Sequence, residues 1–66
     1  MKFELLIRLG NEAMQTTQDI GWVLFNVGTE LTNLSYAERP LGPSDQVSVT
    51  LRDKNGNTVG AWSVTV

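Results

Sequence analysis

The sequence predicts an α+β domain in which one amphipathic helix packs on one face of a three-stranded, mainly antiparallel sheet. Three observations predict this βαββ order. Apolar residues alternate with other residues at the start of the chain, an apolar stripe with helical spacing follows, and two more alternating segments are joined by an Asn-Gly dipeptide. The chain has 66 residues, so we expect a single domain covering residues 1–66.

The first predicted strand covers residues 2–9, with the sequence KFELLIRL. Every second residue is apolar, which is typical of a strand with one buried face. Gly10 and Asn11 end this segment. Residues 10–15 then form a loop, in which we expect Met14 to fill a gap beneath the next element.

The predicted helix covers residues 16–36. Thr16 and Asp19 have the spacing of an N-cap residue followed by an acidic residue in the first turn. The apolar stripe consists of Ile20, Val23, Leu24, Val27, Leu31 and Leu34. We place the helix end near Tyr36, because Arg39 precedes Pro40 and is biased away from helical geometry.

The last two predicted strands, residues 45–53 and 57–66, form a hairpin. A two-residue turn at Asn55-Gly56 sets Val49 opposite Trp62 on the inner face of the sheet. A three-residue turn would instead send Trp62 to the outer face. We prefer the first register, because it also places Val47, Leu51 and Val64 on the inner face.

The strand order follows from the direction of the helix. If the helix runs back over the sheet, the first strand joins antiparallel to the third strand, which becomes central. Parallel pairing with the second strand is the alternative. The predicted core consists of Phe3, Leu5, Ile7, Leu9, the helix stripe, Val47, Val49, Leu51, Trp62 and Val64.

Composition limits the classes of function. The formal charge is −2, too mild for binding DNA through many phosphate contacts. No apolar run approaches the roughly 20 residues of a membrane span, and the N-terminus lacks the features of a signal peptide, so we expect a cytoplasmic protein. A core of this size rarely supplies more than about 3–5 kcal/mol, so association with another chain would help.

The chain offers little chemistry for catalysis or metal binding. It has no Cys and no His, and it contains no phosphate-binding glycine motif. The segment from Asp53 to Asn57 resembles the start of an EF-hand loop, but Val64 stands where the bidentate Glu is required. We therefore expect a non-enzymatic protein with no cofactor and no metal site.

The outer face of the predicted helix is unusual. It carries aromatic and small polar residues and almost no charge, although that face should meet water. Its members are Trp22, Phe25, Thr29, Thr32 and Tyr36. Exposed aromatic strips mark interaction sites, so we predict self-association through this face, with a homodimer favoured. The alternative is that Trp22 and Phe25 fold back over the sheet edge or over the connector RPLGP, residues 39–43, between the helix and the second strand.

The uncovered sheet face supports a second hypothesis. It is predicted to carry Lys2, Glu4, Leu6, Arg8, Ser48, Thr50, Arg52, Val59, Ala61, Ser63 and Thr65. Arg8, Thr50 and Arg52 could together contact a small anion or a nucleic acid. No aromatic residue lies on this face to stack on bases, which argues against single-stranded nucleic acid.

Two motifs suggest a context for the protein. The segment LGNEAMQT after the first strand and the segment LRDKNGNTVGAWSV at the hairpin resemble small uncharacterised proteins of actinobacterial phages and mobile elements. The resemblance implies a shared fold and a bacterial host, and inhibition of a host protein would be a role in that context. The helices of that group usually carry several charges on their outer side, and this chain departs from them there.

Overall fold

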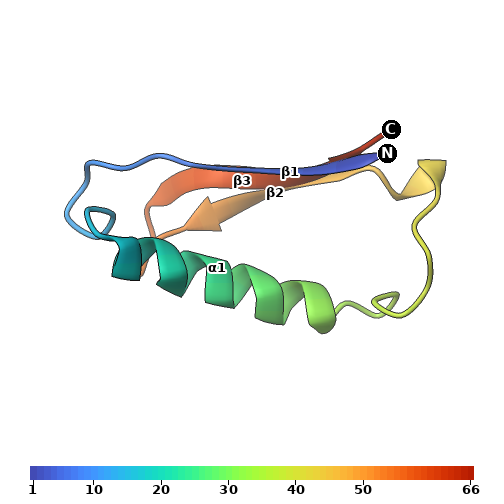
Figure 1. Cartoon of the computed structure of the whole chain (residues 1–66), viewed down its shortest axis with the longest axis horizontal. Coiled ribbons are helices and arrows are strands. Elements are labelled where there is room, and N and C mark those ends of the chain that lie inside the picture. The colour runs from blue at the N-terminus through green and yellow to red at the C-terminus, as the bar shows by residue number, and fades with distance from the viewer.

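The computed structural model describes residues 1–66 and has the predicted βαββ architecture. The elements are β1 (Lys2–Ile7), α1 (Thr17–Thr32), a short 3-10 turn η1 (Pro43–Asp45), β2 (Val47–Arg52) and β3 (Thr58–Thr65). The sheet order is β1-β3-β2 with both neighbouring pairs antiparallel, so β3 is central. α1 forms a second layer on one sheet face (Figure 1). Parallel pairing of the first and second strands is therefore excluded.

The hairpin between β2 and β3 has the predicted register but not the predicted turn. Val49 lies opposite Trp62, as expected. The turn, however, comprises residues 54–56, since the N–H of Asp53 bonds to the carbonyl of Asn57 at 2.9 Å. Gly56 has a φ of +84°, the left-handed conformation that closes such a three-residue turn. A β-bulge at Val59 then adds one residue to β3 and restores the predicted register.

The bulge moves Val59 into the core. Thr58 is exposed, while Val59 and Gly60 are both buried, so alternation is broken at this point. Val59 is only 2 % exposed and belongs to the main apolar cluster. The prediction that Val59 lies on the uncovered sheet face is therefore wrong, because the bulge turns two consecutive residues toward α1.

The start of α1 agrees with the prediction and its end does not. Thr16 is the N-cap, and its hydroxyl and the Asp19 carboxylate form a reciprocal capping box. The helix ends at Thr32 rather than Tyr36. Thr32 donates its hydroxyl to the carbonyl of Thr29 at 3.1 Å, and Asn33 forms the C-cap. Short polar side chains that bond to nearby backbone are poor helix formers, which favours an early end.

The core is small and lies between α1, the sheet and the loop of residues 10–15. Met14 is fully buried, which confirms its predicted role. The fully buried cluster consists of Met14, Val23, Val27, Leu51, Val59, Trp62 and Val64, with Leu5, Ile7, Ile20, Leu31, Val47 and Val49 packed around it. Phe3, Leu9 and Leu24 were expected in the core but are 48 %, 59 % and 46 % exposed. Strand β1 ends at Ile7, so the chain has already left the sheet at Leu9.

The loop of residues 10–15 and the hairpin turn are joined by Asp53, which is 3 % exposed. Asn11 Nδ2 donates to Asp53 Oδ2 at 3.1 Å, across 42 residues of sequence. The N–H groups of Asn55 and Asn57 donate to Oδ1 at 2.8 and 3.0 Å. Burial alone raises the pKa of Asp53, but the hydrogen bonds from Asn57 and Asn55 outweigh it and the pKa is lowered. The charged carboxylate is thus the form that fits this site.

Carboxylates make the fold sensitive to acid. Hydrogen bonds from Arg39, at 2.8 and 3.0 Å, and from the N–H of Gly42 lower the pKa of Asp45 from 3.8 to about 2. Backbone N–H groups of Gln15 and Thr16 also lower the pKa of Asp19. A group whose pKa is lower in the folded state contributes stability above its unfolded pKa, and that contribution is lost as pH falls.

We therefore expect the melting temperature to fall as pH is lowered from about 4 to 2. The variant Asp45→Asn should show a smaller fall over the same range, because it has no carboxylate to protonate at that site. Circular dichroism melts of both proteins at several pH values provide the measurement. Parallel curves for the two proteins would contradict the assignment to Asp45.

Candidate interaction surface

The outer face of α1 is largely apolar in the structure. Phe25 is 75 % exposed and Trp22 is 44 % exposed. Thr29 and Thr32 are also exposed, but their hydroxyls donate to the carbonyls of Phe25 and Thr29 within the helix, each at 3.1 Å. These hydroxyl hydrogens are therefore already used, and the face offers few free donors to solvent.

Trp22 and Phe25 do not form one continuous strip with Tyr36. Tyr36 lies beyond the helix end, where it is half-buried and Arg39 stacks over its ring at 5.0 Å. With Leu34, Leu41, Val47 and Trp62 it lines a small, mainly apolar cavity of about 40 Å³. The prediction that Tyr36 belongs to the outer helix face is wrong, because the helix ends before it.

Trp22 lies on the side of α1 that faces β2 and the hairpin. A shallow groove on that side is lined by Trp22, Val23, Asn26, Val27, Glu30, Thr50, Leu51, Arg52 and Asp53. Trp22 and Leu24 come immediately before and after the buried Val23, so they project to opposite sides of it, about 100° away in each direction. Leu24 therefore lies on the side of the helix that faces away from β2.

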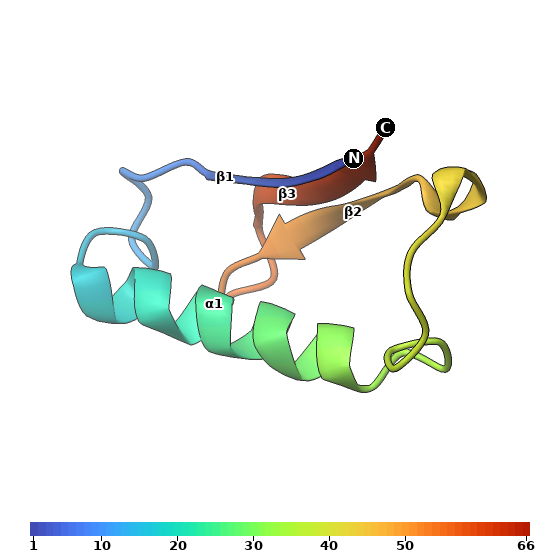
Figure 2. The ribbon, with the colours of Figure 1, turned by 45° about the vertical axis from the view of Figure 1, so that its right-hand side comes forward.

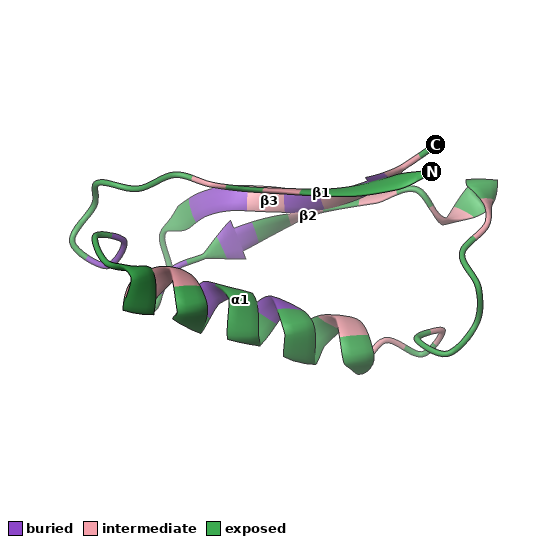
Figure 3. Ribbon diagram, in the orientation of Figure 1, coloured by how far each residue is buried: buried purple, intermediate pink, exposed green.

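The side of the two-layer structure away from β2 is left uncovered. Phe3 and Leu9 of the first segment and Leu24 of the helix are exposed toward this side, and Phe25, about 160° from Val23, is exposed on the solvent-facing back of α1. We call these four residues the open side. Figure 3 shows β1 coloured as mostly exposed along its length, whereas the neighbouring β3 is buried or intermediate except at its first residue. Figure 2 shows β1 at the margin of the sheet, with no other segment beyond it.

Two glycines make the helix narrow on this side. Gly21 and Gly28 flank Leu24 at intervals of three and four residues, so the three share one face. A Cβ atom at either glycine would have no neighbour within 4 Å. Each glycine costs about 1 kcal/mol relative to Ala in a helix. Nothing inside this chain requires them, and they leave room for another backbone to approach.

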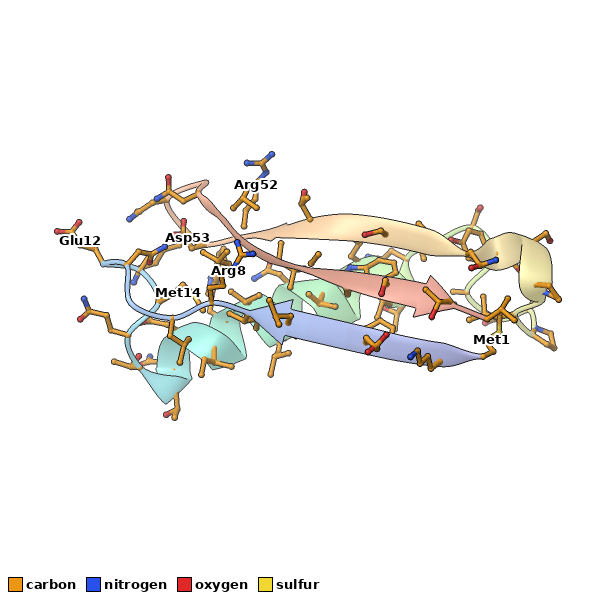
Figure 4. The ribbon with its side chains drawn as sticks, turned by 90° about the horizontal axis from the view of Figure 1, so that it is seen from above. Met1, Arg8, Glu12, Met14, Arg52 and Asp53 are labelled. Carbon is orange, nitrogen blue, oxygen red and sulfur yellow. The ribbon has the colours of Figure 1, made fainter.

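The alternative ligand face is present but only partly free. Arg8, Thr50 and Arg52 come from the outer side of the sheet, and Figure 4 shows Arg8 and Arg52 near the hairpin end, on either side of β3. The Arg52 guanidinium donates to the carbonyl of Gly56 at 3.0 Å and lies 3.5 Å from the Thr58 hydroxyl. Arg52 therefore already stabilises the hairpin, which leaves Arg8 as the freer cation of the two.

The structure shows no cluster of three or more His, Cys, Asp or Glu side chains that could hold a metal ion. It also contains no helix with the length and apolarity needed to span a membrane. In comparisons with protein-family models, curated proteins and solved structures, nothing matched this chain significantly. The surfaces of the chain itself therefore carry the information on its function.

Proposed function

We propose that this chain is a small, non-enzymatic interaction module that works by surface contact, and that its first partner is a second copy of itself. The observation that supports the proposal is the open side, where four large apolar residues remain exposed in a chain that buries very few. Monomeric proteins seldom leave such residues grouped together. A second copy would cover them and add buried area that a domain of this size lacks.

The surface that we propose differs in part from the one that the sequence suggested. Phe25 belongs to both, and Thr29 and Thr32 lie close to it on the exposed helix. Trp22 faces the groove beside β2 instead, and it is less exposed than Phe25. We therefore place Leu24 and Phe25 at the centre of the helix contribution, with Trp22 outside it.

The double variant Leu24→Glu with Phe25→Glu should convert the dimer to a monomer. Burying a charged residue in an interface centre costs several kcal/mol, so we expect the dissociation constant to rise at least about a hundredfold. Sedimentation equilibrium over a wide concentration range provides the measurement. Circular dichroism should show the same helix and sheet content, because both side chains are exposed.

Trp22→Glu is the matched control, since Trp22 is also an exposed aromatic residue of α1 but lies on the other side of Val23. It should leave the association almost unchanged. If Trp22→Glu alone abolished the dimer, the groove beside β2 would be the contact surface. If the unmodified chain sedimented as a monomer at millimolar concentration, self-association would be wrong.

The biological context follows from the two motifs that resemble proteins of actinobacterial phages and mobile elements. In that context we propose that the module acts in the host cytoplasm and inhibits a host protein by occluding its surface. A second candidate function is anion or nucleic-acid binding at Arg8, Thr50 and Arg52, supported by the two cations on one sheet face. A mobility shift with a single-stranded oligonucleotide at several salt concentrations separates the two, because phosphate contacts weaken with salt.

A further inference from the structure

The free edge of β1 offers unpaired backbone groups along the open side. Arg8 donates its N–H to the carbonyl of Val59 at 2.6 Å, so the even-numbered residues of β1 direct their backbone groups toward β3. In an antiparallel strand these groups alternate between the two edges. Phe3, Leu5 and Ile7 therefore direct their N–H and C=O groups away from the sheet. Such an edge readily pairs with another strand.

We infer that two copies pair antiparallel through β1 about a two-fold axis at Leu6, so that Glu4 lies opposite the partner's Arg8. This inference rests on the proposed function, since it specifies how the two copies meet. In this register Leu5 exchanges backbone hydrogen bonds with the partner's Ile7, which uses the free groups of the edge. The result is one continuous sheet with three strands from each copy and both helices on the same face.

Charge and the exposed Leu6 together favour this register among the symmetric ones. Residues opposite each other must point to the same sheet face, which allows only shifts of two residues in the pairing. Centring on Leu5 would place Lys2 opposite the partner's Arg8, and centring on Glu4 would place two carboxylates together. Both arrangements oppose like charges, which is destabilising. Centring on Leu6 instead gives two symmetric Glu–Arg pairs. Centring on Phe3 would also oppose unlike charges, Lys2 and the partner's Glu4, but it leaves Leu6 outside the paired segment, and centring on Ile7 forms no ion pair.

The same register covers the exposed apolar residues of this part of the molecule. On the outer face, Leu6, which is 59 % exposed, would meet the partner's Leu6. On the inner face, Leu5 would lie opposite the partner's Ile7, and Phe3 would lie at the end of the paired segment, beside the point where the partner's chain leaves the sheet. Beneath the joined strands, the two helices would approach through the face that carries Gly21, Leu24 and Gly28. One interface thus explains why these residues are exposed in the single chain.

The other sheet edge is less suited to this pairing. β2 exposes Ser48, Thr50 and Arg52 on its outer face and has no large exposed apolar residue. Arg52 is the one charged residue of β2, so a symmetric pairing of two β2 strands has no opposite charges to bring together. We therefore assign the pairing to β1 and leave β2 as the outer edge of the combined sheet.

Cysteine trapping tests this pairing directly, because the chain has no cysteine of its own. In the proposed register, Leu6 and the partner's Leu6 form a non-hydrogen-bonded pair with a Cα separation of about 4.5 Å, which a disulfide can span. Leu6→Cys should give a cross-linked dimer under mild oxidation at low protein concentration. Thr50→Cys, an exposed position on β2, is the control and should remain largely monomeric on a non-reducing gel.

A charge swap tests the register independently. Glu4→Arg should raise the dimer dissociation constant about tenfold, because both ion pairs become repulsive. The double variant Glu4→Arg with Arg8→Glu should restore the original value, since the opposite charges then face each other again. Sedimentation equilibrium of all three proteins provides the comparison.

The outcomes separate this inference from the proposed function. A dimer that traps through Leu6→Cys and is rescued by the charge swap supports both. A dimer that traps equally through Thr50→Cys, or that is not rescued by the swap, overturns the β1 pairing while the interaction module stands. An unmodified chain that stays monomeric at high concentration overturns both.

Discussion

Replacing Gly60 by alanine is expected to abolish the folded state. Gly60 lies in the central strand β3, opposite Ile7 of β1 and Leu51 of β2. A Cβ atom at this position would overlap the carbonyl oxygen of Leu6 and lie 2.8 Å from the Leu6 carbonyl carbon. These are backbone atoms of a paired strand, so they cannot move away without breaking the pairing of β1 with β3. A loss of about 3 kcal/mol or more would exhaust the stability of a core this small.

The expected result for Gly60→Ala is loss of near-ultraviolet circular dichroism and collapse of amide chemical-shift dispersion. Gly42→Ala is the matched control, because its Cβ would have one neighbour, Asp45 Oδ2, at an ordinary 3.8 Å. That variant should keep the spectrum of the unmodified chain. A Gly60→Ala variant that kept the same melting temperature would show that β1 can adjust to a side chain at this position.

Gly60 illustrates how much of the hairpin could be predicted from the sequence. The alternation of apolar residues in both strands was sufficient for the register, because only one register buries Val49, Trp62 and Val64 together. It was not sufficient for the turn. A two-residue turn without a bulge and a three-residue turn with a bulge at Val59 give the same register. Only the structure distinguishes the two turns. It therefore also decides on which side of the sheet Val59 lies.

The helix illustrates a second limit. Thr16 and Asp19 predicted its start, since capping depends on residues that are close in the sequence. Its end was placed too late, because Leu34 continues the apolar spacing although the chain has already left the helix. Periodicity records which residues approach the core, and a turn can supply such a residue as well as a helix can. The position of Tyr36 was predicted incorrectly for this reason.

The candidate surface was found from the sequence only in part. An aromatic residue on the outer face was a clear signal at Phe25. Exposure of Phe3, Leu9 and Leu24 left no such signal, because their spacing matches that of core residues. Leu9 is exposed because the chain leaves the sheet after Ile7, and Leu24 is exposed because α1 packs toward β2. Sequence periodicity contains no information on either.

The two motifs, LGNEAMQT and LRDKNGNTVGAWSV, have structural roles in this chain. Asn11 of the first motif bonds to Asp53 of the second, and Thr16 caps α1. Met14 and Val59, one from each motif, are both almost fully buried. The motifs therefore describe how the loop of residues 10–15 closes against the hairpin. The two motifs account for part of the fold. The function must be sought on the exposed surfaces of the chain.

The second substitution with a large expected effect on stability is at Met14, in the loop that closes against the hairpin. Met14 is 0 % exposed and belongs to the cluster that also contains Val23, Leu51 and Val59. The backbone on either side of it is fixed, since its N–H bonds to the carbonyl of Asn11 and its carbonyl accepts from Gly10. The surroundings therefore cannot close around a smaller residue, and Met14→Ala should leave a cavity. Such substitutions cost about 2–5 kcal/mol.

This cost is comparable to the whole stability of the chain, so Met14→Ala should be largely unfolded at 25 °C when it is studied as a dilute monomer. Met14→Leu conserves volume and should cost less than about 1.5 kcal/mol, which makes it the matched control. Urea titrations followed by tryptophan fluorescence provide both free energies, because Trp62 is buried in the same cluster and becomes exposed on unfolding, while Trp22 is already 44 % exposed. If Met14→Ala and Met14→Leu had the same midpoint, the loop of residues 10–15 would not be part of the cooperative core. The pairing of the two motifs would then be a surface contact and not a requirement of the fold.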